Sequence, residues 1–347
     1  MSTARIARTL RAHVETWRPY TLWYCGLVGL AGAALVGGPH HPWRLAAAWA
    51  APTAGWLGGH YLSDYFDREL DAGSKPHRPI PSGRLSGRAA VWCGSACFAV
   101  LVGLAAAGGW ATASVAVAAA LGMVAYGRWF KARGLSGNVV RGALGAIALL
   151  YGAAVAGFHP APGLPAARTI AALLVLMAAF WLHDTASNLT GTLRDIDGDR
   201  AGGYRTLPVR QGTPFAVTTV LVLYAAAIAA ALAGGLLAGR GRADFLATLL
   251  VAAATGVTAL APLVAHRAQM PVVVALRAHS VLVIERIVLA SAIVGLGLGV
   301  GWQLGLAAPM VALTWWTQST MRKQHELGTA KPVPATPAGQ VSVKDVT

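Results

Sequence analysis

The fold of this chain is constrained most strongly by a series of apolar segments, each about as long as a bilayer is thick. A helix needs about 20 apolar residues to cross the hydrocarbon core. The segments lie at residues 20–37, 43–62, 89–107, 110–126, 138–157, 167–190, 214–237, 244–265, 280–300 and 302–320. They predict an all-α, polytopic membrane bundle of nine or ten transmembrane helices, the count depending on whether 302–320 is a full span.

The composition agrees with a membrane environment. Hydrophobic residues make up 56% of the 347 residues and charged residues 12%, whereas soluble domains carry about 25% charged residues. The 41 glycines fit the same environment, because small residues let helices approach closely in lipid. Cys93 and Cys97 lie one helical turn apart, which favours packing over a disulfide.

The basic residues indicate the orientation in the membrane. Lys and Arg fall mainly in every second connection between apolar segments, and cytoplasmic connections carry such an excess. This rule places the N-terminus and both acidic stretches described below in the cytoplasm. It accounts for the net charge of +15 without a nucleic-acid partner, and it assigns Arg322 and Lys323 to topology alone.

Three parts of the chain follow from these patterns. Residues 1–19 predict a basic cytoplasmic arm on the membrane surface. Residues 20–321 form the predicted transmembrane domain, and residues 322–347 are polar and proline-rich, which predicts a disordered cytoplasmic tail.

The first acidic stretch lies directly after the second apolar segment, within residues 63–88. Asp64, Asp67 and Asp71 are three and four residues apart, so a helix places them within about 60° of one another. Glu69 points away from this face. Three carboxylates on one stripe repel each other unless a cation lies among them. The stripe therefore predicts a metal site, with Mg²⁺ as the expected ion.

A second acidic stretch follows the sixth apolar segment. On a continuous helix Asp184, Asn188, Asp195 and Asp199 share a face within about 60°, whereas Asp197 points elsewhere. Mg²⁺ binds through one or two carboxylates together with substrate phosphates. Two such stripes on one side of the membrane therefore predict a metal-bridged, anionic substrate.

Basic residues close to these carboxylates are candidates for binding phosphate oxygens, which Arg contacts bidentately. A third cytoplasmic connection adds Tyr126 and Asn138, although Tyr also serves as an anchor at membrane interfaces. The basic candidates are Lys75, Arg78, Lys131, Arg141, Arg194, Arg200 and Arg205.

Together these motifs resemble those of the UbiA superfamily of intramembrane prenyltransferases. Asp64-Tyr-Phe-Asp67-Arg-Glu-Leu-Asp71, followed by Lys75-Pro-His-Arg78, is similar to its first aspartate motif. Arg194-Asp195-Ile-Asp197-Gly-Asp199-Arg200 is similar to the second, and residues 126–138 resemble the loop between them. Ser63 stands where the family usually has Asn, and Asn188 matches the polar position of the second motif.

The resemblance implies a helical bundle around a central cavity that binds a prenyl diphosphate through Mg²⁺. Asp64, Asp67 and Asp71 would form one catalytic metal site, and Asp195 and Asp199 the other. The expected diphosphate-binding residues are Arg78, Lys131, Asn138, Arg141, Asn188 and Tyr126. The expected enzyme is a prenyltransferase of the cell membrane whose active site faces the cytoplasm.

The sequence leaves the acceptor open. We expect an electron-rich, aromatic acceptor that attacks an allylic cation shielded from water. One alternative is a membrane terpene cyclase, which uses no acceptor. An alternative of another class is a divalent-cation transporter or channel, although the carboxylates gather on one face and the spans carry few charges besides Glu285 and Arg286. We expect these two residues to pair with neighbours in the bundle.

Overall fold

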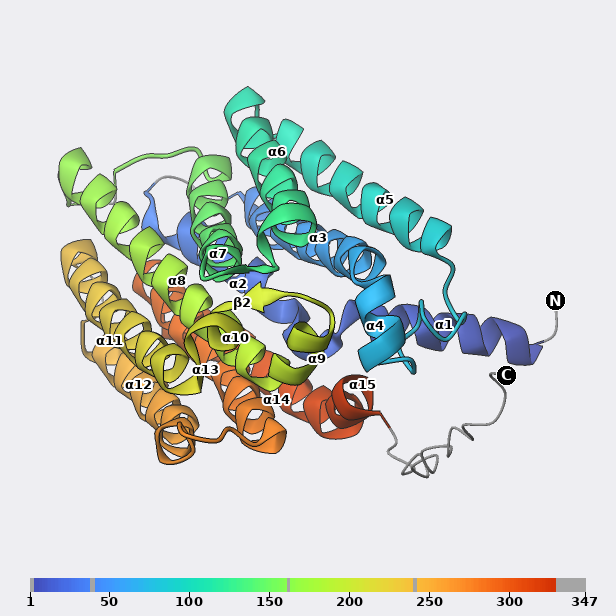
Figure 1. Cartoon of the computed structure of the whole chain (residues 1–347). Helices are drawn as coiled ribbons and strands as arrows, with labels where there is room; N and C mark the ends of the chain where they lie inside the picture. The colour runs from blue at the N-terminus through green and yellow to red at the C-terminus, as the bar shows by residue number, and fades with distance from the viewer. Residues whose placement is uncertain (1–2, 38–40, 161–162, 240–241, 329–347) are drawn as a thin grey trace, which may run out of the picture.

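The computed structural model describes residues 3–37, 41–160, 163–239 and 242–328, and most of them are helical (Figure 1). In chain order the elements are α1 (Thr3–Trp17), α2 (Pro19–Leu35), α3 (Pro42–Phe66), α4 (Arg68–Ser74), α5 (Gly87–Ala106), α6 (Trp110–Ala125), the π-helical turn η1 (Tyr126–Phe130), β1 (Arg133–Gly134), α7 (Ser136–Val155), α8 (Ala166–Arg194), α9 (Ile196–Ala201), β2 (Arg205–Thr206), α10 (Leu207–Gln211), α11 (Thr213–Ala238), α12 (Arg242–Ala265), α13 (Val272–Leu298), α14 (Val300–Thr317), the π-helical turn η2 (Gln318–Arg322) and α15 (Lys323–Leu327).

Every one of the ten predicted apolar segments is helical. Helix α13 begins earlier than predicted, at Val272, because the residues before 280 continue its apolar pattern. Within the described residues, seven helices are long and apolar enough to cross a membrane, namely α5, α6 with η1, α7, α8, α11, α12 and α13. The all-α membrane fold is therefore confirmed, whereas the count of nine or ten spans stays a prediction.

Two helices, α2 and α13, lie in the interior of the bundle (Figure 1). Helix α2 packs against α3, α7 and α13, and α13 also contacts α8, α12 and α14. Almost all of α2 from Tyr24 onward is buried. Its Gly29 lies against the backbone of Ala48 on α3, and its Gly32 against the backbone of Leu149 on α7. Small residues thus bring the helices close enough for backbone contact.

Both acidic stretches lie at helix ends that bend, which differs from the continuous helices expected. Helix α3 ends at Phe66, and the chain passes through Asp67 into the short helix α4. Likewise α8 ends at Arg194, and the chain passes through Asp195 into α9. Helices α4 and α9 are in contact, so the two stretches meet, as predicted.

A two-residue parallel pairing joins a third segment to this region. Strand β1 pairs with β2, with Arg133 opposite Arg205 and Gly134 opposite Thr206. Because β1 follows Lys131 and β2 follows α9, the pairing holds the connection between α6 and α7 against the second acidic stretch.

The C-terminal part of the bundle corrects one expectation. Residues 322–347 were predicted to be a disordered tail, yet η2 and α15 continue the chain as helix to Leu327. His325 and Glu326 are buried there. The remainder of the predicted tail, residues 329–347, lies outside the described residues.

The predicted N-terminal arm forms helix α1, which is tied to the bundle by polar contacts. His13 Nδ1 lies 2.7 Å from the Tyr61 hydroxyl, and Trp17 Nε1 donates to the same hydroxyl at 2.6 Å. Glu15 forms a 2.7 Å ion pair with Arg84. These contacts fix α1 beside α3 and the loop after α4.

Candidate active site

The two acidic stretches open onto one pocket of about 190 Å³ between the helix ends. Four of the five predicted metal-binding aspartates line it, and so do all six predicted diphosphate-binding residues. The predicted residues on its wall are Asp67, Asp71, Asp195, Asp199, Arg78, Lys131, Asn138, Arg141, Asn188 and Tyr126.

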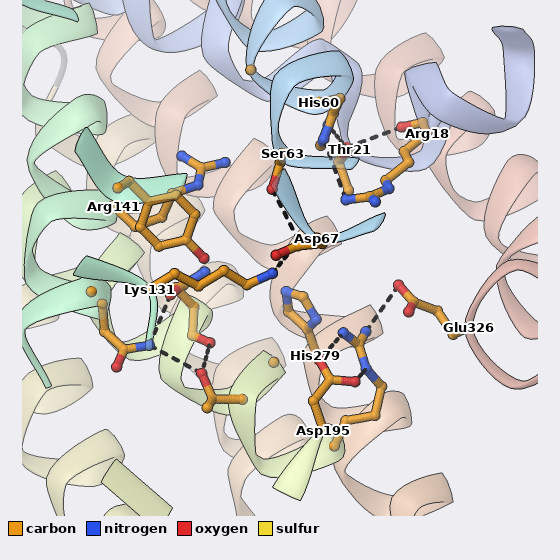
Figure 2. Close-up of a pocket in the computed structure, with 18 of the residues that line it drawn as sticks. Arg18, Thr21, His60, Ser63, Asp67, Lys131, Arg141, Asp195, His279 and Glu326 are labelled. Carbon is orange, nitrogen blue, oxygen red and sulfur yellow. Dashed lines mark hydrogen bonds and ion pairs between the residues drawn. The ribbon is translucent and has the colours of Figure 1, made fainter. Parts of the chain in front are cut away.

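The first acidic stretch contributes two carboxylates that are already paired with cations. Lys131 donates to Oδ2 of Asp67 across the pocket (Figure 2). Burial disfavours the charged amine, but Asp67 raises the pKa of Lys131 above its ordinary value. Asp71 binds Arg78 at 2.8 Å. Ser63, in the position where the family usually has Asn, lies 3.5 Å from Asp67 Oδ2.

Asp64 differs from its two neighbours. It is buried but is absent from the pocket wall, and its Oδ1 accepts a hydrogen bond from Arg18, between α1 and α2. In this arrangement Asp64 positions Arg18, which does line the pocket. Its direct role as a metal ligand remains a prediction.

The second acidic stretch contributes Asp195, which lies between two cations. Arg194 contacts its Oδ2 at 2.6 Å and Lys75 its Oδ1 at 2.8 Å. Burial alone raises the pKa of a carboxyl group, but here Arg194 and Lys75 hold the pKa of Asp195 well below its ordinary range. Asp195 is therefore ionised throughout the physiological range.

Asp199 has the opposite electrostatic character. Burial and the nearby negative charge of Asp195 raise the pKa of Asp199 to about 6. Thr206, on β2, donates a 3.1 Å hydrogen bond to its Oδ2. Of the cations in the pocket, none in the described part of the chain forms an ion pair with Asp199.

The remaining predicted residues form the wall on the side of α7 and α8. Asn138, predicted on a loop, lies in the first turn of α7. Its Nδ2 donates to Asn188 at 2.8 Å and to Thr192 at 3.1 Å. The guanidinium group of Arg141 lies 3.8 Å above the ring of Trp56 and 5.9 Å from the ring centre of Tyr126.

Four charged residues of the motifs point away from the pocket. Glu69 and Asp197 are exposed, as their helical phase predicted, and pair with Arg68 and Arg200. Arg200 and Arg205 were predicted to be candidate phosphate ligands, which is wrong, because both side chains are exposed and neither lines the pocket.

Glu326, which was not predicted as a site residue, enters the pocket from α15. Its carboxylate lies 3.0 Å from Arg194, 3.1 Å from Arg78 and 3.4 Å from Lys75. Although burial raises the pKa of a carboxyl group, Arg194 and Lys75 hold the pKa of Glu326 well below its ordinary range. No local pattern signals this role, since Glu326 belongs to neither aspartate motif.

Arg322 was also missed, because it was assigned to membrane topology alone. It is only 2% exposed and lines the pocket together with His279 on α13. Arg322 Nη2 lies 2.8 Å from His279 Nδ1.

The intramembrane pair Glu285 and Arg286 behaves as predicted. Glu285 lies 2.5 Å from Nε2 of His183 and accepts a 3.2 Å hydrogen bond from Tyr224. Arg286 lies 3.8 Å from Asp184 and 4.2 Å above the Tyr24 ring. Asp184 and Arg286 both line the pocket, whereas Glu285 and His183 do not.

The carboxylate oxygens of the pocket fit a hard divalent cation that a bound ligand also coordinates. Oδ1 of Asp67 is buried and has no hydrogen-bond partner among the described residues, and an orphaned carboxylate oxygen is a ready ligand. No three His, Cys, Asp or Glu side chains in the described ranges form a metal cluster. Oxygen donors in small number, completed by phosphate, are typical of Mg²⁺ sites.

Comparison with known proteins agrees with this geometry. The model of the UbiA prenyltransferase family matches residues 23–281, most of the chain. A digeranylgeranylglyceryl phosphate synthase of Natronomonas pharaonis is 35% identical over 58% of this chain and 69% of its own length. One of Ignicoccus hospitalis is 36% identical over 64% of this chain and 71% of its own length.

Solved structures share the fold. A UbiA homolog from Aeropyrum pernix K1 superposes with a TM-score of 0.67 at 20% identity, covering 78% of this chain and 96% of that one. A UbiA homolog from Archaeoglobus fulgidus bound to GPP and Mg²⁺ has a TM-score of 0.57 at 15% identity, covering 89% and 99%. The chain therefore belongs to the UbiA prenyltransferase family, the multi-pass membrane prenyltransferases that its two aspartate motifs predicted.

Proposed function

We propose that this protein transfers a prenyl group from a prenyl diphosphate to the hydroxyl group of a lipid acceptor in a Mg²⁺-dependent reaction. One observation carries the proposal: Asp67 and Asp71 of the first stretch and Asp195 and Asp199 of the second line a single pocket. A diphosphate bound there lies within reach of both carboxylate pairs.

The carboxylates of the two stretches would hold the metal. Asp67 offers an unpartnered oxygen, and Asp199 pairs with no cation among the described residues. When bound, Mg²⁺ neutralises the diphosphate and stabilises its charge as it leaves. The solved structure of the Archaeoglobus fulgidus homolog with GPP and Mg²⁺ supports this choice of ion.

The chain's own cations bind and orient the diphosphate. Lys131 lies beside Asp67, and Arg78 beside Asp71, so both cations stand next to the proposed metal ligands. Arg141 forms no ion pair among the described residues and stacks on Trp56 instead. Its guanidinium is thus free to donate to a phosphate oxygen.

An apolar pocket beside the first one would receive the part of the prenyl chain nearest the diphosphate. It has a volume of about 50 Å³, and Trp56 and Met123 belong to the walls of both pockets. Its other walls are mainly apolar, among them Phe98, Leu101 and Ile147. A chain bound there extends from the diphosphate into the bundle. The apolar walls keep water from the allylic carbon while its bond to oxygen breaks.

The reaction exchanges one carbon–oxygen bond for another. The bond between C1 of the prenyl group and the diphosphate oxygen breaks, and diphosphate leaves with the bonding electrons. The acceptor hydroxyl oxygen then bonds to C1, and its proton is released. Electrostatic stabilisation of the leaving group by fixed cations supplies the main catalytic effect.

The acceptor we propose differs from the aromatic one predicted from the sequence, for which the comparisons give no support. The relatives are named for a product in which a glyceryl phosphate carries two geranylgeranyl groups. We therefore propose a glyceryl phosphate that already carries one prenyl chain as the acceptor.

We also propose that the pocket opens toward the cytoplasm. The connections that carry the two acidic stretches are rich in Lys and Arg, and such an excess is typical of the cytoplasmic side.

The test is product analysis with purified protein in lipid nanodiscs, labelled geranylgeranyl diphosphate and Mg²⁺. Candidate acceptors are geranylgeranylglyceryl phosphate, an aromatic carboxylic acid, and none. We expect a doubly prenylated glyceryl phosphate with the first acceptor only. A cyclic hydrocarbon formed without acceptor would identify a terpene cyclase instead, and an aromatic product would restore the original prediction.

A further inference from the structure

Arg322 is a buried cation of the pocket that the proposed chemistry does not use. Its side chain enters from η2, after the last long helix, and is 2% exposed. Its Nε and Nη1 are buried without a hydrogen-bond partner in the described part of the chain. Burial lowers the pKa of Arg322 to about 10, so the guanidinium still carries its charge at neutral pH.

Apart from Arg141, which stacks on Trp56 and is assigned above to the diphosphate, the other Arg and Lys side chains of the pocket each have a carboxylate. Arg78 pairs with Asp71, and Lys131 with Asp67. By contrast, no ion pair joins Arg322 to any carboxylate within the residues that the structure describes. A buried charge without a partner is costly. Its presence on a pocket wall indicates that a negatively charged ligand completes it.

Two neighbouring side chains add polar groups to Arg322. Tyr20, on α2, is buried, its hydroxyl has no partner among the described residues, and its ring centre lies 5.3 Å from the Arg322 guanidinium. His279 Nδ1 faces Arg322 Nη2 at 2.8 Å. Because Nδ1 accepts this hydrogen bond, the proton of a neutral imidazole lies on Nε2, which is a further donor. Both residues line the pocket.

The arrangement matches a tetrahedral anion better than a neutral head group. The guanidinium has two unpartnered nitrogens, Nε and Nη1, each of which can donate to an anionic oxygen. The ring of Tyr20 and the imidazole of His279 lie against Arg322 from two other helices. Their convergence around Arg322 gives a site built from three elements that are distant in the sequence.

We propose that Arg322, Tyr20 and His279 form a second anion subsite, which binds the phosphate of the acceptor lipid and so selects acceptors that carry one. This inference rests on the proposed function and adds the residues that recognise the acceptor. It predicts that the pocket binds two anionic groups at once, the diphosphate of the donor and the phosphate of the acceptor.

The donor's diphosphate has its own set of cations, which supports the separation. Lys75, Arg78 and Arg194 all contact Glu326, and Lys131 contacts Asp67. Arg322 contacts none of these carboxylates in the described residues; it faces His279 instead.

The experiment measures equilibrium binding of labelled geranylgeranylglyceryl phosphate, without prenyl diphosphate or Mg²⁺, to purified protein in nanodiscs. We expect Arg322→Gln to weaken binding at least about tenfold, the cost of losing a charge-assisted contact. Arg322→Lys should recover part of the affinity. The same lipid without its phosphate should bind the wild type and Arg322→Gln equally and weakly. Lys323→Gln, an exposed neighbouring residue with the same charge change, is the matched control.

Several results would overturn the proposal. If Arg322→Gln reduced the affinity for the phosphorylated and the dephosphorylated lipid equally, Arg322 would have a packing role. Absence of binding by the wild type would contradict the subsite, as would inorganic phosphate that binds as tightly as the lipid. If Arg322→Gln weakened the binding of geranylgeranyl diphosphate but not that of the acceptor lipid, Arg322 would belong to the donor site.

The binding result is separable from the proposed function. If the phosphorylated lipid binds and depends on Arg322, yet no prenyl transfer follows when donor and Mg²⁺ are added, the subsite stands and the proposed reaction fails. If transfer occurs with unchanged KM for the acceptor in Arg322→Gln, the reaction stands and the subsite fails.

Discussion

Glu326 accepts a 3.1 Å hydrogen bond from Arg78, although the two residues are 248 positions apart in the chain. The same carboxylate also contacts Arg194 and Lys75. A residue of the last described helix therefore neutralises cations of both acidic stretches. Under the proposed function, a bound diphosphate would compete with Glu326 for these cations.

The first prediction concerns this competition. Glu326→Gln keeps the size of the side chain but removes the charge that competes with diphosphate oxygens. We expect the dissociation constant for geranylgeranyl diphosphate to fall about tenfold, since charge-assisted hydrogen bonds contribute about 1.5–3 kcal/mol. Isothermal titration in nanodiscs measures it. Glu69→Gln, at an exposed carboxylate, is the control, and an unchanged or raised dissociation constant in Glu326→Gln would contradict the competition.

The second prediction follows from the raised pKa of Asp199. The pKa of Asp199 is about 6. At a pH below this value Asp199 is protonated and a poor metal ligand, and at a higher pH its carboxylate can bind the metal. From pH 7.5 to 5.5 its ionised fraction falls about fourfold, so the Mg²⁺ concentration for half-maximal substrate binding should rise by that factor.

The diphosphate of the substrate also titrates in this pH range. The variant Asp199→Asn separates the two effects, because it lacks the carboxyl group of Asp199 but binds the same substrate. The variant should bind Mg²⁺ and prenyl diphosphate more weakly, with a smaller change between the two pH values than the wild type. An identical pH dependence in both proteins would remove Asp199 from metal binding. Asp197→Asn, whose carboxylate is exposed, should behave as the wild type.

The third prediction concerns the contact between α2 and α7. A methyl group on Gly152 would overlap the backbone oxygen of Gly29, whereas one on Gly103 would meet no atom within 4 Å. Gly152→Ala should therefore destabilise the protein by about 1–3 kcal/mol, and Gly103→Ala should be neutral or stabilise it by up to about 1 kcal/mol. Thermal unfolding in detergent measures both, and equal effects of the two substitutions would contradict the close packing.

The fourth prediction concerns the buried carboxylate Glu285, whose side chain is fully enclosed between His183 and Tyr224. Glu285→Ala leaves His183 without this partner and Tyr224 with only the 3.4 Å contact to the Ala252 carbonyl oxygen, so we expect a loss of about 3 kcal/mol or more. The loss appears as a lower thermal unfolding midpoint. Glu285→Gln, which retains a hydrogen-bonding group, should destabilise the protein less. An unchanged unfolding midpoint in Glu285→Ala would show that the contacts of Glu285 with His183 and Tyr224 add no stability.

Much of this site could be predicted because its residues lie close together in the sequence. The spacing of Asp67 and Asp71 and the apolar segments before them follow helical periodicity, which local sequence reveals. The bends at Asp67 and Asp195 were not predicted. The short helices α4 and α9 that follow these bends are in contact, which local periodicity does not report.

The residues that were missed depend on tertiary structure alone. A basic residue just after an apolar segment has the same sequence signature whether its side chain is exposed, as that of Lys323 is, or lines a pocket, as that of Arg322 does. The roles of Arg200 and Arg205 were predicted wrongly for the same reason. Glu326 lay in a polar stretch whose composition suggested disorder, and only its three ion pairs distinguish it.

The central claim is that carboxylates of both acidic stretches act together on one diphosphate. The most direct measurement is Mg²⁺-dependent release of diphosphate from labelled geranylgeranyl diphosphate, with acceptor present, by wild type, Asp67→Asn and Asp195→Asn in nanodiscs. We expect each substitution to reduce the rate at least about a thousandfold while insertion and thermal stability change little. Wild-type rates in either variant would contradict a shared site.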